Sequence, residues 1–148
     1  MTSLKDRVEA EFEHIERTLA ALPEERSYSE LSTLELAGVA TLLHNFYSGV
    51  ENILKHVVQD RGLELPGGEF WHRDLVTLAV SAQLLQEVTA EKLRQYLAFR
   101  HFFVHAYALD LLPERLEPLD NGIRKVFHAF RQDIEKAVEE DSHCSPPL

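Results

Sequence analysis

The sequence has a single cysteine, Cys144, among its 148 residues, so no disulfide can form within the chain. Basic residues are also scarce, because 15 Lys and Arg stand against 25 Asp and Glu, which gives a net charge of −10. This balance argues against a protein that binds nucleic acids in general through attraction to their phosphate backbone. No apolar run approaches the roughly 20 residues of a membrane span, and the N-terminus lacks the apolar stretch of a signal peptide. We therefore expect a cytoplasmic protein.

The alternation of apolar and polar residues that marks β-strands is missing, and so are internal repeats and linkers. Apolar residues recur instead at intervals of three and four over long stretches, as in amphipathic helices. This spacing predicts four long helices and a shorter one, over about 3–22, 32–61, 71–82, 89 to 107 or 110, and 120–140. Short connections between such helices imply an all-α antiparallel bundle. We expect a single domain over 1–140 and a disordered tail over 141–148.

Several helix ends carry recognisable signals. Ser3 is expected to cap the first helix with Asp6 at the capping-box position, and Gly62 is expected to stop the second. Thr89 is an acceptable cap for the fourth. Gly49 in mid-helix indicates that another element approaches closely there. A polar stripe on the second helix either faces water or lines a site: Thr41, Asn45, Ser48 and Asn52.

One apolar helix is expected to carry an arginine, two histidines and a tyrosine within eight residues: Arg100, His101, His105 and Tyr107. The apolar spacing around them predicts burial on most sides, where an unpaired guanidinium is costly. We therefore expect Arg100 either to pair with a carboxylate such as Glu51 or to lie at a wet cleft. Arginine binds phosphate through two hydrogen bonds, and histidine suits acid–base chemistry near neutral pH. The set is suited to binding or cutting a phosphodiester without a metal.

Plainer explanations remain open for each of these residues. His105 could be a hydrogen-bonded core histidine, and Tyr107 a packing residue. His101 and His105 have the spacing of two metal ligands on one helix face, but no third ligand follows from the sequence. Trp71 and His72 fit a loop anchor, or else a ligand contact.

Helix geometry limits what one chain can do with these residues. Arg100 and His105 are five residues apart, so on a regular helix they point about 140° from each other. Either the helix is distorted at its end, or two copies of the chain pool their residues. Tyr107 is seven residues after Arg100, which would place it about 20° away on the same face.

Arg100, His105 and Tyr107 stand in the order R-x4-H-x-Y, which resembles the motif of the HEPN superfamily and in particular its HepT-like ribonuclease toxins. Residues 45–53 resemble the second helix of that family, and residues 65–75 resemble its helix-connecting loop. The resemblance covers most of residues 30–110. It implies a homodimer that builds a shared cleft from the motifs of both protomers.

The resemblance also implies a function, that of a metal-independent endoribonuclease toxin that needs no cofactor. Arg100 would stabilise the phosphate, His105 would act as acid or base, and His101 would be an auxiliary residue. A cognate minimal nucleotidyltransferase antitoxin would attach AMP to Tyr107. In the family, asparagine, aspartate or another polar residue often follows the arginine; here the residue is His101, which is polar but leaves open whether catalysis is retained. The alternatives are a non-catalytic substrate- or nucleotide-binding partner subunit of a minimal nucleotidyltransferase, or a purely structural oligomerisation domain.

Overall fold

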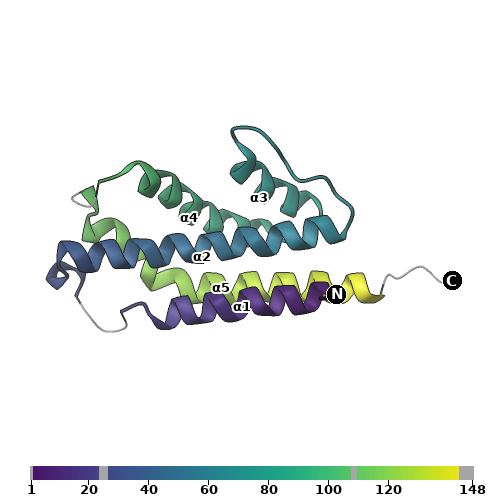
Figure 1. Ribbon diagram of the computed structural model, residues 1–148, viewed down its shortest axis with the longest axis horizontal. Helices are drawn as coiled ribbons and strands as arrows, with labels where there is room; N and C mark the ends of the chain where they lie inside the picture. Colours follow the sequence, from purple (N-terminus) through teal and green to yellow (C-terminus); the bar gives the residue numbers. More distant parts are fainter. Residues whose placement is uncertain (1, 24–26, 108–109, 144–148) are drawn as a thin grey trace.

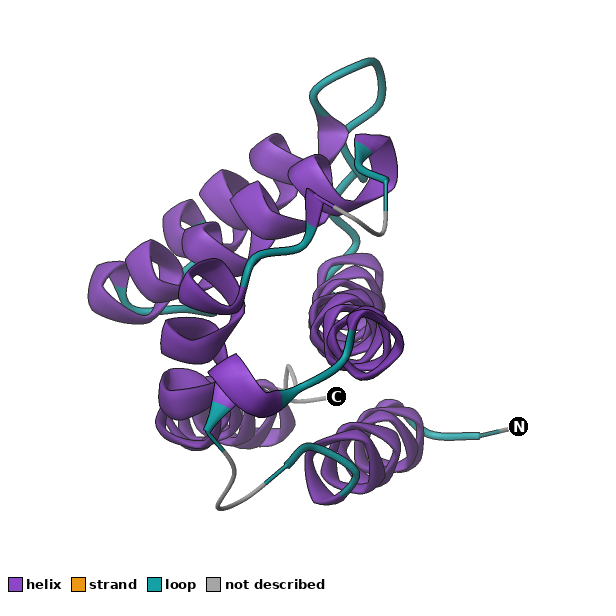
Figure 2. Ribbon diagram, turned by 90° about the vertical axis from the view of Figure 1, so that its left-hand side faces the viewer, coloured by secondary structure: helices purple, strands orange, loops and turns teal. Residues whose placement is uncertain are grey.

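A computed structural model describes residues 2–23, 27–107 and 110–143, with side chains up to residue 140. Its elements, in chain order, are α1 (Leu4–Ala20), the 3-10 helix η1 (Tyr28–Glu30), α2 (Thr33–Asp60), α3 (Trp71–Ser81), α4 (Glu87–His105) and α5 (Pro113–His143). No strand is present in these ranges, and Figure 2 accordingly draws only helices and loops. The all-α prediction, with four long helices and a short one, is confirmed.

Helix α2 lies at the centre of the bundle and contacts each of the other four α-helices. Figure 1 shows α3 and α4 along one side of α2, and α1 and α5 along the other. The long helices α1, α2, α4 and α5 run in alternating directions, which is the antiparallel arrangement that short connections produce. No helix among the described residues is long and apolar enough to cross a membrane.

The core forms where the apolar faces of the helices meet around α2. The apolar residues of α2 that recur at intervals of three and four are all buried: Leu36, Ala40, Leu43, Tyr47, Val50, Leu54 and Val57. Gly49 is buried between them, and a β-carbon built at this position would lie 2.7 Å from Ile15 Cγ1 of α1. The predicted close approach at Gly49 is therefore confirmed. Three residues of the polar stripe of α2, Asn45, Ser48 and Asn52, border a groove between α1 and α2. Three of the four stripe residues are exposed.

Local signals place several helix ends correctly. The Ser3 hydroxyl accepts a hydrogen bond from the Asp6 N–H, and Ser32 and Glu35 form a reciprocal capping box at the start of α2. Gly62 follows α2 with φ of 73°, the left-handed conformation that favours glycine after a helix.

Other ends differ from the predictions. Helix α1 stops at Ala20, two residues early, and α4 begins at Glu87, so that Thr89 is a buried residue inside the helix and not its cap. Helix α5 begins at Pro113, seven residues before the expected start, because proline is well suited to the first helical position. It continues to His143, three residues past the expected domain end, and residues 144–148 lie outside the described part of the chain.

A buried polar contact joins η1 to α5. The Tyr28 hydroxyl donates a hydrogen bond to Asp120 Oδ2, and both residues are buried. Burial is the main cause that raises the pKa of Tyr28 above its usual range, and the bond to Asp120 adds to the effect. The phenol therefore stays protonated and remains a donor to the carboxylate.

Candidate functional site

The motif lies on the last two turns of α4, which are more open than the sequence predicted. The buried residues of α4 lie in its first half and middle: Thr89, Ala90, Leu93, Tyr96 and Phe99. Beyond Phe99 the helix emerges from the core, and Val104 is 49% exposed. The expectation that this helix is buried on most sides is thus wrong at its C-terminal end, because only α2 and the start of α5 remain to cover it.

Arg100 is partly buried on the α2 side of α4. Its positive charge acts on two α2 residues. It adds to the effect of burial in lowering the pKa of His44, and it partly offsets the rise in the pKa of Tyr47 that burial and Glu51 cause. Among the described residues Arg100 makes no hydrogen bond or ion pair. Glu51, the carboxylate that could have paired with it, instead lies with Oε2 2.7 Å from His72 Nδ1 on α3. The pairing of Arg100 with Glu51 is therefore not observed.

The Glu51–His72 pair is part of a buried polar cluster beneath Arg100. Glu51 is 4% exposed and Tyr47 is fully buried one helical turn before it. The Tyr47 hydroxyl has no hydrogen bond of ordinary geometry with the described residues. Burial first, and then the neighbouring Glu51 carboxylate, raise the pKa of Tyr47 above its usual range. The expectation that His72 anchors the loop before α3 is confirmed, because it ties α3 to α2.

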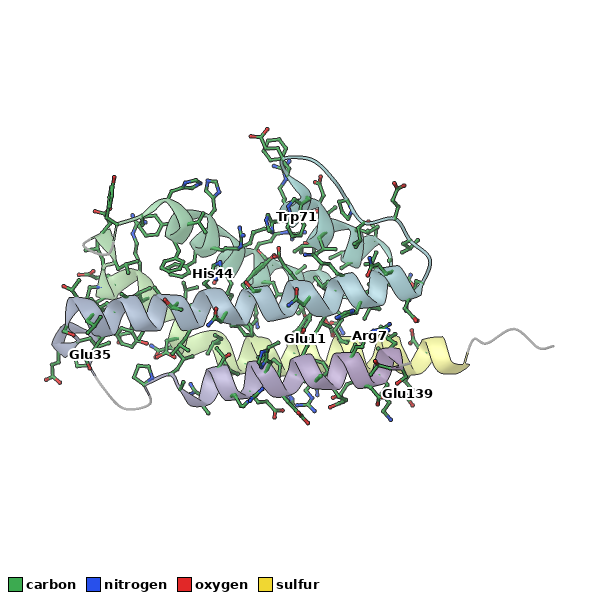
Figure 3. The ribbon with its side chains drawn as sticks, viewed as in Figure 1. Arg7, Glu11, Glu35, His44, Trp71 and Glu139 are labelled. Atoms are coloured by element: carbon green, nitrogen blue, oxygen red, sulfur yellow. The ribbon has the colours of Figure 1, made fainter. Side chains whose placement is uncertain are left out.

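His44 is a site residue that the sequence did not reveal. Its ring lies 5.5 Å from that of Phe103, centroid to centroid, and Figure 3 shows it between α2 and α4. Burial, followed by the charge of Arg100, lowers the pKa of His44 below its usual value. His44 is therefore neutral at neutral pH and can accept a proton. Its only signal in the sequence was the spacing of His44, Tyr47 and Glu51, which places all three on one face of a helix.

His101 and His105 form an exposed pair at the end of α4. Their ring centroids are 5.2 Å apart with planes inclined at 71°, as side chains one turn apart allow. Both residues are exposed, so the explanation of His105 as a core histidine is wrong. In the described ranges no group of three or more His, Cys, Asp or Glu is placed to hold a metal ion.

Tyr107 lies beyond the helix. Helix α4 ends at His105, and Ala106 has extended backbone angles of φ −92° and ψ 152°. The Tyr107 N–H donates to Asp110 Oδ2 at 3.1 Å, so a nearby aspartate takes the donor that the helix would have used. The expectation that Tyr107 continues the helical face of Arg100 is therefore wrong. Its ring is 79% exposed, so the alternative of a packing residue is also wrong.

The geometry of a single chain separates the motif residues. Arg100 interacts with the α2 side, whereas His101 and His105 are exposed to solvent and Tyr107 extends from the loop after α4. Within its described residues, one chain therefore offers a partly buried cation with no hydrogen-bond or ion-pair partner and, on another face, two accessible imidazoles.

Comparison with known proteins supports a family assignment. Residues 38–140 match a family model described as HepT-like protein, which covers more than two thirds of the chain and includes the motif. No match was found among curated proteins. One similar solved structure is that of YutE from Bacillus subtilis, described as a cytosolic protein of unknown function. It has a TM-score of 0.76 at 15% identity, over 97% of this chain and 95% of that one, and shows the same fold. The family match confirms the resemblance seen in the sequence, and the chain belongs to the HepT-like family.

Proposed function

We propose that this protein is a metal-independent endoribonuclease toxin that works as a homodimer, with Arg100 and His105 in a cleft shared by two protomers. The observation that carries the proposal is Arg100 itself, a partly buried cation without a carboxylate partner among the described residues. An arginine held in this way is suited to bind an anion from outside the chain.

The exposed surface around the motif supports association of two copies. Val104 and Leu112 are large apolar residues that are 49% and 48% exposed, and they are close in sequence to the exposed His105. Clustered exposed apolar residues are typical of protein interfaces. A two-fold axis near the end of α4 would bring His105 of one protomer towards Arg100 of the other. On one regular helix, Arg100 and His105 point about 140° apart, but residues from two protomers can face the same phosphate.

The reaction that these groups can perform is cleavage by the RNA's own 2′-hydroxyl. A base removes the 2′-hydroxyl proton, the 2′ oxygen bonds to phosphorus, and the bond from phosphorus to the 5′ oxygen breaks. An acid protonates that leaving oxygen, so the products are a 2′,3′-cyclic phosphate and a 5′-hydroxyl. His105 would supply acid or base, with His101 as auxiliary, while Arg100 stabilises the charge on the phosphorane.

The test is RNA cleavage by the purified protein in the presence of EDTA. Arg100→Ala and His105→Ala should each lower the rate by about 10²-fold or more. Lys92→Ala and His128→Ala are matched controls, because these residues are exposed and lie outside the motif. Cleavage at the parental rate by either motif variant would show that the roles are wrong. RNA binding without any cleavage would favour the non-catalytic partner subunit, and a monomer in sedimentation would refute the shared cleft.

The exposed Tyr107 is the proposed point of control by a minimal nucleotidyltransferase antitoxin. Its phenol oxygen would attack the α-phosphorus of ATP, pyrophosphate would leave, and the phenol proton would pass to a base of the partner. The attached AMP adds an anion that competes for Arg100 and a base that obstructs RNA. The tryptic peptide containing Tyr107 should gain the mass of AMP when the partner is co-expressed. Full neutralisation with an unmodified peptide would instead show that the antitoxin acts by binding.

A further inference from the structure

Two aromatic side chains at the start of α3 are each covered by a cation. The Lys55 Nζ lies 4.3 Å from the centre of the Trp71 ring, and the Arg73 guanidinium carbon lies 4.7 Å from the centre of the Phe70 ring. Phe70 is 55% exposed, so its ring contributes little to the core. We refer to these four residues as the aromatic platform. Exposed rings beside cations are the elements with which proteins bind single-stranded nucleic acids.

A hollow of about 270 Å³ adjoins the platform, lined by Lys55, Leu65, Pro66, Trp71 and Leu75. This volume is close to the ~300 Å³ lower end of small-ligand sites. Apolar walls with one ammonium at the edge suit a planar base whose phosphate lies next to the lysine.

The charges of the platform are available to a ligand. Lys55 has no carboxylate partner in the part of the chain described by the structure, and Arg73 Nε is 4.0 Å from Asp74 Oδ1, with both side chains more than half exposed. An exposed ion pair of this kind contributes little free energy, so Arg73 can exchange it for a contact with a ligand. The exposed Glu69 beside Phe70 keeps the local charge near balance, so binding here would depend on stacking more than on charge.

The platform lies on the same side of α2 as Arg100. His72, next to Trp71, binds Glu51, and Lys55 and Tyr47 are each one helical turn from Glu51 on α2. The charge of Arg100 in turn affects the pKa of Tyr47. From Tyr47 to Lys55 the helix rises about 12 Å, and Figure 3 shows Trp71 and His44 on the same side of α2. A short RNA segment can therefore span both places.

We propose that the aromatic platform binds unpaired bases of single-stranded RNA next to Arg100. The bases stack on the open side of Phe70 and enter the hollow beside Trp71, while Lys55 and Arg73 contact phosphates. The proposal rests on the proposed function, and it makes the enzyme selective for unpaired RNA, because bases in a duplex cannot reach the rings.

The experiment measures binding separately from cleavage. The full chain with His105→Ala, which should not cut, is titrated with a short fluorescein-labelled single-stranded RNA of mixed sequence, and anisotropy is recorded at constant salt. Adding Phe70→Ala should weaken binding by about tenfold or more, as expected for loss of one stacking ring. Phe70→Tyr should restore binding, and Lys55→Gln should weaken it. Val88→Ala, at 54% exposure, and the exposed Lys92→Gln are the matched controls and should bind like the parent.

The possible results separate this proposal from the ribonuclease. If Phe70→Ala and Lys55→Gln bind RNA like the parent, or if the annealed duplex binds as tightly as the single strand, the platform proposal is wrong even when the parent cuts RNA. If Phe70→Ala keeps RNA binding but no longer forms a complex with the nucleotidyltransferase, the platform is a protein-binding surface and the proposal is likewise overturned. If the platform variants weaken binding but Arg100→Ala cuts as fast as the parent, the platform is supported and the catalytic assignment fails. Circular dichroism of each variant checks that the fold is intact.

Discussion

Gly49 offers a direct test of how tightly α1 packs on α2. A β-carbon at this position would lie 2.7 Å from Cγ1 and 3.0 Å from Cδ1 of Ile15, closer than carbon atoms approach in folded proteins. Ile15 is 1% exposed and cannot move away without disturbing its neighbours. Overpacking of this kind costs about 1–3 kcal/mol, and the better helix propensity of alanine returns at most about 1 kcal/mol. Because Cγ1 is near the backbone, Gly49→Ala should destabilise the protein by roughly 1–2 kcal/mol.

Gly38 is the matched control, since it lies in the same helix and is exposed. A β-carbon there would meet nothing within 4 Å. Gly38→Ala should therefore stabilise the protein by about 0.5–1 kcal/mol through helix propensity alone. The same substitution thus has opposite effects on stability at the two positions, and the two variants should differ by about 1.5–3 kcal/mol.

Urea unfolding followed by far-UV circular dichroism measures both variants on one scale. If Gly49→Ala were as stable as Gly38→Ala, the packing of α1 on α2 described above would be wrong. A second substitution sharpens the test. Ile15→Ala alone should cost about 2–5 kcal/mol as a cavity. Combined with Gly49→Ala it should cost less than the sum, because the added methyl group partly fills the space.

Three further predictions concern buried and partly buried polar groups. Tyr28→Phe leaves the buried Asp120 carboxylate without its donor and should lower the free energy of unfolding by about 1–3 kcal/mol; unchanged stability would contradict the role of this bond. The pKa of His44 is lowered in the folded state, so the unfolded state binds more protons and stability falls as the pH drops below about 6.5. In His44→Gln the melting temperature should fall less steeply as the pH drops, whereas the same pH dependence as in the parent would show that His44 does not cause the fall. Glu51→Gln and His72→Gln should show a coupling of about 0.5–3 kcal/mol in a double-mutant cycle, whereas additive effects would mean that the contact contributes nothing.

The parts of the fold that the sequence predicted are those that local patterns determine. The buried face of α2 follows from apolar spacing, and its end follows from Gly62. The close approach at Gly49 could be predicted because glycine in the middle of a helix is unfavourable, so its presence there indicates that another element packs closely against it. Helix ends that depend on longer-range effects were missed. Pro113 reads as a stop signal, but a following amphipathic segment makes it the first residue of α5.

The residues of the candidate site could be proposed from the sequence, but their surroundings could not. Arg100, His105 and Tyr107 form a pattern within one segment, so the sequence shows it directly. His44 comes from a different helix, and its place beside Arg100 follows from how α2 and α4 pack, which no short pattern encodes. Tyr107 departs from the helix because Asp110 accepts its N–H, a competition that helical spacing does not reveal.

In the proposed ribonuclease, the position of Glu51 leaves Arg100 available for an anion. A buried carboxylate next to an arginine would normally pair with it and use up its charge. Here His72 reaches Glu51 from α3 and takes that position, so the carboxylate is satisfied and the helices are joined. Arg100 then retains its hydrogen-bonding groups in a chain with a net charge of −10. If this is correct, removing the imidazole by His72→Ala should free Glu51 to compete for Arg100. That variant should lose RNA cleavage although the residue lies outside the motif, and Glu51→Gln in the same background should restore part of it, whereas unchanged cleavage by His72→Ala would refute the argument.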